Sequence, residues 1–228
     1  MLGPTFSALT GLNNASKRLQ NSANNLANVQ TAGFKKGEVT SVQSKSGGTR
    51  VNSVAKVNTQ GGLIPTNNPL DLAIEGNGFF QVTNPNGGMS FTRSGSFSLN
   101  GAGQVVDSSG NALIPDINVP AGNNGISIGA NGQISTQTPA ALEVAGQIQL
   151  ANFNNPAGLS AAGGNLLNES AASGAPVVGN PNQGPFGSVL SGFLEGSNVD
   201  IAEEMIDQIV AKAAFKANVN VIKANDEM

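Results

Sequence analysis

Hydrophobic and polar positions follow a helical period at both ends of this chain and a strand period between them. Near the N-terminus, apolar and small residues recur every seven positions in two adjacent rows. The rows are Leu12, Leu19 and Leu26, and Leu9, Ser16 and Ala23. This spacing places both rows on one side of a helix and predicts a helix over 5–29. Gly33 is a suitable stop, since glycine readily adopts the backbone conformation that ends helices.

The C-terminal segment has an even wider apolar face. Ser197 and Asn198 are suitable caps, and the acids that follow suit a first helical turn. Three apolar rows run along the predicted helix: Ile201, Met205, Ile209 and Ala213; Ile206, Val210, Ala214 and Ala217; and Phe215, Val219 and Ile222. A helix that is apolar over so much of its circumference must be buried on several sides. We therefore expect other subunits to cover it.

Between these helices, short alternating runs are separated by Asn-Gly and Pro-containing turns. This pattern predicts an antiparallel β domain. The fold class is therefore α+β, with terminal helices forming a coiled-coil-like layer and a central antiparallel all-β domain. The predicted parts are an N-terminal core helix (1–34), a linker or extended segment (35–62), the β domain (63–153), an irregular extended connection (154–196) and a C-terminal core helix (197–228).

Composition excludes several classes of function. The 228 residues include no His and no Cys, so His- or Cys-dependent catalysis, zinc held by these side chains, and disulfides are excluded. We expect no cofactor and no metal. With 11% charged residues and a net charge of −3, the chain offers no basic face for nucleic acid. It shows neither a Sec-type signal peptide nor an apolar run long enough for an integral membrane segment.

Two groups of polar residues leave alternatives open. Asp71 and Glu75 resemble a carboxylate pair for glycoside hydrolysis, but a strand that ends in a turn more often points such acids outward or uses them as caps. We therefore expect no enzyme activity. Asn24, Asn25 and Asn28 are either solvated or buried between helices, where they would fix the helix register.

Four segments resemble the bacterial flagellar axial proteins, the family of rod and hook subunits. The segments are ANNLANVQTAGFKK (23–36), NPLDLAIEGNGFFQV (68–82), FTRSGSF (91–97) and LEGSNVD (194–200). They occur in the family's order and cover both ends and much of the middle. The chain length and the lack of a large inserted domain favour a rod subunit of the distal type. A hook subunit is the alternative, because 146–153 is the version shared by both, and 37–50 is shorter than in typical distal rod proteins.

The resemblance implies a structural subunit that polymerises into a helical tube, transmits motor torque and leaves an export channel. Its expected partners are further copies, other rod and hook subunits, and the flagellar type III export apparatus. Its expected location is the periplasm-spanning rod of the basal body, or the extracellular hook. A secreted adhesin-like β protein would explain the turns but not the two helices.

The residues predicted to pack between subunits lie on the two helices, although the N-terminal rows could instead cover the chain's own core. They are Leu9, Leu12, Leu19, Ala23, Asn24, Asn25, Leu26, Asn28, Ile201, Met205, Ile209, Ala213, Phe215, Val219 and Ile222.

Overall fold

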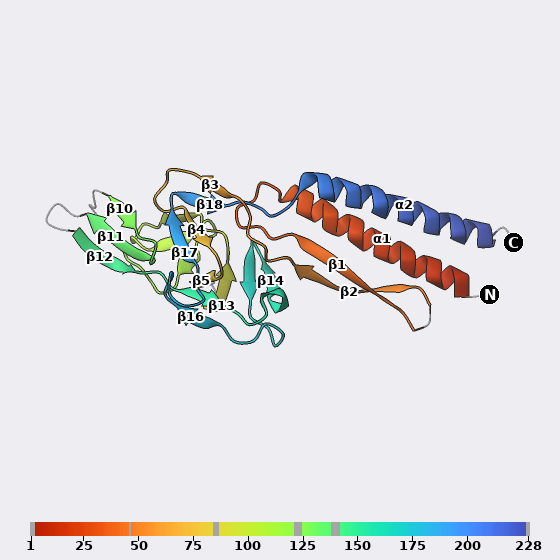
Figure 1. Ribbon diagram of the computed structural model, residues 1–228, viewed down its shortest axis with the longest axis horizontal. Coiled ribbons are helices and arrows are strands. Elements are labelled where there is room, and N and C mark those ends of the chain that lie inside the picture. The colour runs from red at the N-terminus through yellow and green to blue at the C-terminus, as the bar shows by residue number, and fades with distance from the viewer. Residues whose placement is uncertain (1–2, 46, 84–86, 121–124, 138–141, 227–228) are drawn as a thin grey trace. The chain divides into compact units, whose positions relative to one another are not determined.

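The computed structural model describes residues 3–45, 47–83, 87–120, 125–137 and 142–226 (Figure 1). The chain forms two units. The helix unit contains Met1–Gln30, Lys35–Asn58 and Asn198–Met228, and the β unit contains Thr31–Phe34 and Thr59–Ser197. Two terminal helices and a central antiparallel β domain confirm the predicted α+β class.

The helix unit consists of a helix pair and one hairpin. Helix α1 spans Gly3–Ala27 and helix α2 spans Ile201–Asp226. Strands β1 (Gly37–Gln43) and β2 (Thr49–Lys56) form an antiparallel hairpin with a register shift between Thr40 and Ser41. Figure 1 shows the helices side by side and antiparallel, with both chain termini at one end and the hairpin beside α1.

Small side chains allow the two helices to pack closely. The fully buried positions of the pair are Ala8, Ala15, Ser22 and Asn25 on α1, and Glu204 and Ala211 on α2. Ser22 Oγ donates to the Glu204 carbonyl oxygen at 3.0 Å, and this contact sets an antiparallel register in which Ala15 lies opposite Ala211. The heptad of small residues at 8, 15 and 22 is therefore the seam within the chain, because large side chains would hold the backbones apart.

The helix ends differ from the sequence expectation. Helix α1 ends at Ala27, and Gly33 lies within the β unit, where its N–H donates to the Glu195 carbonyl at 2.7 Å. Asp200 caps α2 by accepting from the N–H groups of Ala202 and Glu203. The expected cap residue Asn198 instead joins Lys36 to Val57 through its side chain.

The β unit is built from short antiparallel strands. They are β3 (Leu63–Pro65), β4 (Leu72–Glu75), β5 (Phe79–Thr83), β6 (Met89–Thr92), β7 (Phe97–Leu99), β8 (Val105–Asp107), β9 (Ala112–Leu113), β10 (Ile126–Ile128), β11 (Gln133–Gln137), β12 (Leu142–Gln147), β13 (Leu150–Asn152), β14 (Ser160–Gly163), β15 (Leu166–Asn168), β16 (Val177–Gly179), β17 (Ser188–Ser191) and β18 (Phe193–Glu195). The main sheet has the order β14-β15-β6-β5-β9-β8-β7, and β13 pairs with both β5 and β16. Strands β10-β11-β12 form a three-stranded sheet, and β17-β4 and β18-β3 form pairs.

The stretch 154–196, which was expected to be irregular, contributes five of these strands. Strand β14 forms a hairpin with β15, and the other four each pair with an earlier strand: β15 with β6, β16 with β13, β17 with β4 and β18 with β3. Glycine, alanine and asparagine are weak strand formers, so local composition does not reveal these strands. The stability of β15 to β18 comes from the earlier strand that each one joins.

The core of the β unit forms two clusters. The larger one joins the main sheet to the three-stranded sheet through residues such as Phe80, Leu113 and Ile134. The smaller one contains Phe79, Phe91 and Phe153, whose rings meet edge to face. Aromatic edge-to-face pairs add specific geometry to apolar burial, so these clusters fix the β unit as one body.

Candidate functional site

The surface of the helix pair carries the predicted packing residues, and on α1 they divide into three groups. Leu9, Leu19, Ala23 and Asn24 are exposed; Leu12, Leu26 and Asn28 are half-buried; and Asn25 is buried at 1% exposure. The leucine rows therefore flank the buried seam and do not form it. Ala8, Ala15 and Ser22 form the seam on α1, and the signal for them in the sequence is their own seven-residue spacing.

Helix α2 leaves most of its predicted packing residues exposed. Ile201, Met205, Ile209, Ala213 and Phe215 are exposed, and Val219 and Ile222 are half-buried. Met205 is 53% exposed and Ile209 is 67% exposed, and the neighbouring Ile206 and Val210 are also exposed. The first three turns of α2 thus carry a continuous patch of large aliphatic side chains. Packing of these residues between subunits stays a prediction.

A buried polar cluster joins the two helices to the hairpin. Asn25 Nδ2 donates to Glu204 Oε1 at 2.7 Å and to the Gly37 carbonyl at 2.9 Å, and Asn25 Oδ1 accepts from the Gly37 N–H at 2.8 Å. Glu204 is only 4% exposed. Asn25 of α1 therefore forms hydrogen bonds with both α2 and β1. Burial of such polar groups is costly unless they are hydrogen-bonded. The three asparagines whose burial was left open therefore differ. Asn25 is buried, Asn28 is half-buried and Asn24 is exposed to solvent.

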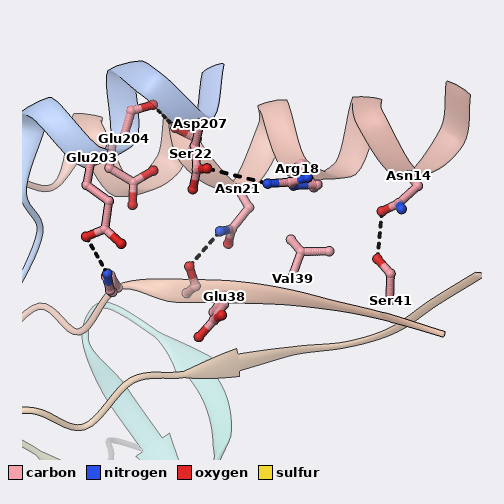
Figure 2. A pocket seen from close by; sticks show the side chains of 12 residues that line it. Asn14, Arg18, Asn21, Ser22, Glu38, Val39, Ser41, Glu203, Glu204 and Asp207 are labelled. Carbon is pink, nitrogen blue, oxygen red and sulfur yellow. Dashed lines mark hydrogen bonds and ion pairs between the residues drawn. The ribbon is translucent and has the colours of Figure 1, made fainter. Parts of the chain in front are cut away.

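Polar side chains of α1 also bind the rest of the hairpin. Asn21 Nδ2 donates to the Gly37 carbonyl at 2.6 Å, and Ser41 Oγ donates to Asn14 Oδ1 at 2.8 Å (Figure 2). Further along, the Thr49 N–H donates to Thr10 Oγ1 at 3.2 Å. The hairpin thus contacts most of the length of α1 through hydrogen bonds. The polar face of α1 is the binding surface for its own hairpin.

A cavity of about 330 Å³ opens between α1, β1 and the start of α2 (Figure 2). Two ion pairs border it: Lys36 Nζ lies 2.8 Å from Glu203 Oε2, and Arg18 Nη2 lies 3.4 Å from Asp207 Oδ1. The hydrogen bond to Glu203 raises the pKa of Lys36 above its ordinary value, against a smaller effect of burial. The described residues contain no group of three or more His, Cys, Asp or Glu side chains that could hold a metal. Glu38 and Glu204 also line the cavity, so acids outnumber bases in its lining by four to two.

A buried ion pair fixes the start and end of the β unit. Arg93 Nη1 lies 3.3 Å from Glu195 Oε2, and Glu195 Oε1 accepts from the Gly61 N–H at 3.0 Å. Arg93 Nη2 also donates to the Gly76 carbonyl at 2.7 Å, and its guanidinium lies over the Phe79 ring. Burial lowers the pKa of Arg93, and the charge of Glu195 opposes this change. The arginine of FTRSGSF thus has a structural role.

Asp71 and Glu75 lie in different surroundings. Asp71 is buried at a bridge to Ser96, and its carbonyl accepts from the N–H groups of Gly192 and Phe193. Glu75 is exposed at the end of β4 and accepts a hydrogen bond from Ser188 Oγ at 3.4 Å. These contacts join β4 to the strands that return from the end of the β unit.

Within the described residues, no helix is both long enough and apolar enough to cross a bilayer.

Comparison with known proteins places this arrangement in one family. Residues 73–136 match the model for the flagellar hook protein FlgE/F/G D1 domain, and residues 190–228 match that for the flagellar basal body rod FlgEFG protein C-terminal region. A flagellar basal-body rod protein FlgG from Agrobacterium fabrum is 36% identical over 247 residues, covering 97% of this chain and 94% of the relative. Another FlgG, from Buchnera aphidicola subsp. Baizongia pistaciae, is 37% identical over 253 residues, which cover 100% of this chain and 97% of the relative.

These matches define the class: the chain belongs to the family of flagellar rod and hook proteins. The relatives just described, which span the whole chain, are FlgG rod proteins. The flagellar hook protein FlgE of Salmonella typhimurium is 41% identical over 86 residues, which cover 38% of this chain and 21% of the relative.

Proposed function

We propose that this chain is a structural subunit of the bacterial flagellar rod–hook axis, of the distal-rod type. It polymerises into a helical tube that transmits motor torque and leaves a channel for export. The observation that carries this proposal is identity of 36–37% with FlgG rod proteins across 97–100% of the chain. Similarity to FlgG extends over nearly the whole chain, whereas the match to the hook protein FlgE covers 38% of it.

The helix pair supplies the physical basis for polymerisation. Leu9 and Leu19 on α1, and Met205 and Ile209 on α2, expose large apolar side chains to water. Complete burial of one such side chain contributes about 1.5–3 kcal/mol. Several of them on one surface favour association, since monomeric proteins rarely leave extended apolar patches uncovered. The cover that we propose is the helix pair of neighbouring axial subunits.

Substitutions on α2 test this proposal without disturbing the single chain. Met205→Gln combined with Ile209→Gln should leave the melting temperature almost unchanged, because both side chains are more than half exposed. The same variant should form no tubes in electron micrographs of concentrated protein. The matched control is Met205→Leu with Ile209→Leu, which keeps the surface apolar and should polymerise. If the glutamine variant forms tubes as readily as the unaltered chain, the proposed role of this surface is wrong.

The partial match to FlgE favours a hook subunit as the second candidate. The two candidates differ in the polymer that they form. Straight tubes support the rod assignment, and curved tubes support the hook assignment. A chain that forms no tubes and retains a binding activity after removal of both helices would instead be an adhesin-like protein.

The remaining parts of the proposal concern location and export. We place the subunit in the basal-body rod, next to other rod and hook subunits, and propose that it leaves the cytoplasm through the flagellar type III apparatus. Secretion should therefore stop in a strain whose flagellar export apparatus is inactive and continue in a strain whose Sec pathway is impaired. The opposite result would refute this route. No reaction is assigned to the chain. If Asp71 and Glu75 are both replaced by Ala, we expect any change in polymerisation to come from altered contacts and not from the loss of a reaction.

A further inference from the structure

Charge is divided unevenly between the two units. The segments of the helix unit contain ten Lys and Arg residues and seven Asp and Glu residues, a net charge of +3. The segments of the β unit contain seven acids and a single base, a net charge of −6. The two values account for the net charge of −3 of the whole chain. A nearly neutral chain thus consists of two units with opposite charges.

The single base of the β unit does not offset the charge of its surface. Arg93 is buried against Glu195, which is also buried, so these two charges neutralise each other inside the unit. Four of the remaining acids are exposed: Glu75, Asp116, Glu143 and Glu169. They lie on or beside different strands, so the exposed negative charge is spread over the β unit.

Four of the ten bases of the helix unit lie toward one end of it. Lys45 and Arg50 lie near the turn of the hairpin, and Lys216 and Lys223 lie in the second half of α2; all four are exposed, as is one acid at this end, Asp226. Two hydrogen bonds place these segments beside the start of α1: Thr49 N–H to Thr10 Oγ1, and Asn225 Nδ2 to Thr5 Oγ1. At the opposite end of the pair, Glu203 and Asp207 are already engaged by Lys36 and Arg18.

We propose that copies of this chain associate head to tail, with the basic end of one helix unit against the acidic β unit of the next copy. The inference rests on the proposed function, since it names the partner surface in a homopolymer. A symmetric contact between like ends would place like charges together, which disfavours it. A reciprocal two-fold dimer would engage both charged surfaces at once and stop growth, which does not agree with the proposed polymer. A contact between different surfaces places opposite charges together, and such heterologous contacts generate open helical assemblies. The proposed partner is a second copy, because each copy carries both a basic end and an acidic β unit and can therefore bind a neighbour at each.

A charge-swap experiment on the full chain tests this proposal. Set A reverses three bases (Lys45→Glu, Arg50→Glu and Lys216→Glu) and changes the helix unit from +3 to −3. Set B reverses four acids (Glu75→Lys, Asp116→Lys, Glu143→Lys and Glu169→Lys) and changes the β unit from −6 to +2. All seven side chains are exposed, so circular dichroism and melting temperature should stay close to those of the unaltered chain. Neutral Gln versions of both sets are the matched controls.

The initial rate of assembly, followed by light scattering, is the measurement. For the unaltered chain, we expect the rate to fall about 10-fold between about 0.01 M and 0.3 M NaCl, because salt screens the attraction between opposite charges that speeds association. At low salt, set A alone and set B alone should each assemble at least about 10-fold more slowly, with the Gln versions intermediate. The combined variant should regain a rate within about threefold of the unaltered chain, because its units again carry opposite charges.

The outcomes separate this inference from the proposed function. If tubes form at a rate that neither salt nor either set alters, the inference is overturned and the function stands. If set A and set B each stop assembly and their combination does not restore it, the charges do not meet each other and the inference is again overturned. If the unaltered chain shows no self-association at any salt concentration, both proposals are overturned.

Discussion

Replacement of Asn25 by Ala should destabilise the helix unit far more than its position in a polar run would indicate. The substitution removes the donor to Glu204 Oε1 and the acceptor for the Gly37 N–H, while Asn21 still donates to the Gly37 carbonyl. Loss of a hydrogen bond to a charged group costs about 1.5–3 kcal/mol, and an unsatisfied buried N–H costs about 1–3 kcal/mol. We therefore expect a loss of about 3 kcal/mol or more in the free energy of unfolding.

Urea and thermal unfolding followed by far-UV circular dichroism measure this loss, because the two helices dominate that signal. A loss of this size lowers Tm by about 12 °C or more in a domain of 60–100 residues. The matched control is Asn24→Ala, one position earlier and exposed, which should change stability by less than about 0.5 kcal/mol. Equal effects at the two positions, or a negligible effect of Asn25→Ala, would refute the account of the buried cluster.

Three further predictions follow from the seam, the Lys36 ion pair and the buried ion pair of the β unit. Ala15→Leu should cost about 1–3 kcal/mol in urea unfolding by overpacking the helix seam, whereas the exposed neighbour Ser16→Leu should have little effect. The raised pKa of Lys36 means that its ion pair stabilises the folded chain fully below the ordinary pKa of 10.5 and loses this effect as pH rises through the higher folded value. The Tm difference between the unaltered chain and Lys36→Gln should therefore be constant from neutral pH to pH 10.5 and shrink above it; a constant difference at higher pH contradicts the assignment. Arg93→Met should cost about 3–5 kcal/mol in urea unfolding by removing the arginine that neutralises the buried Glu195 carboxylate, and adding Glu195→Leu should recover part of that loss.

The sequence predicts the class of fold because periodicity at the two ends differs so clearly from that of the middle. It does not predict which row of α1 faces α2. The leucine rows have the spacing expected of a packing seam. The buried row is instead the alanine and serine row at 8, 15 and 22, because antiparallel helices that lie close together need small side chains between them. The exposed leucines, Leu9 and Leu19, are therefore among the residues that we propose pack against neighbouring subunits.

Long-range contacts explain the other differences between expectation and structure. Asn24 and Asn25 are identical in type and adjacent in sequence, and only the distant partners Gly37 and Glu204 distinguish them. Likewise, β15, β17 and β18 become strands through pairing with segments about 75 to 130 positions earlier, a relation that no local pattern encodes.

The helix unit draws on the first and the last segments of the chain, and this arrangement sets the order in which the protein can fold. Asn25 and the small residues of α1 have no partner on α2 until that helix has emerged from the ribosome. The β unit lies almost wholly within one continuous stretch, so it can close first. A chain synthesised from its N-terminus thus keeps the helix pair unformed until α2 is complete, and joining two segments across so long a loop is a late and slow event.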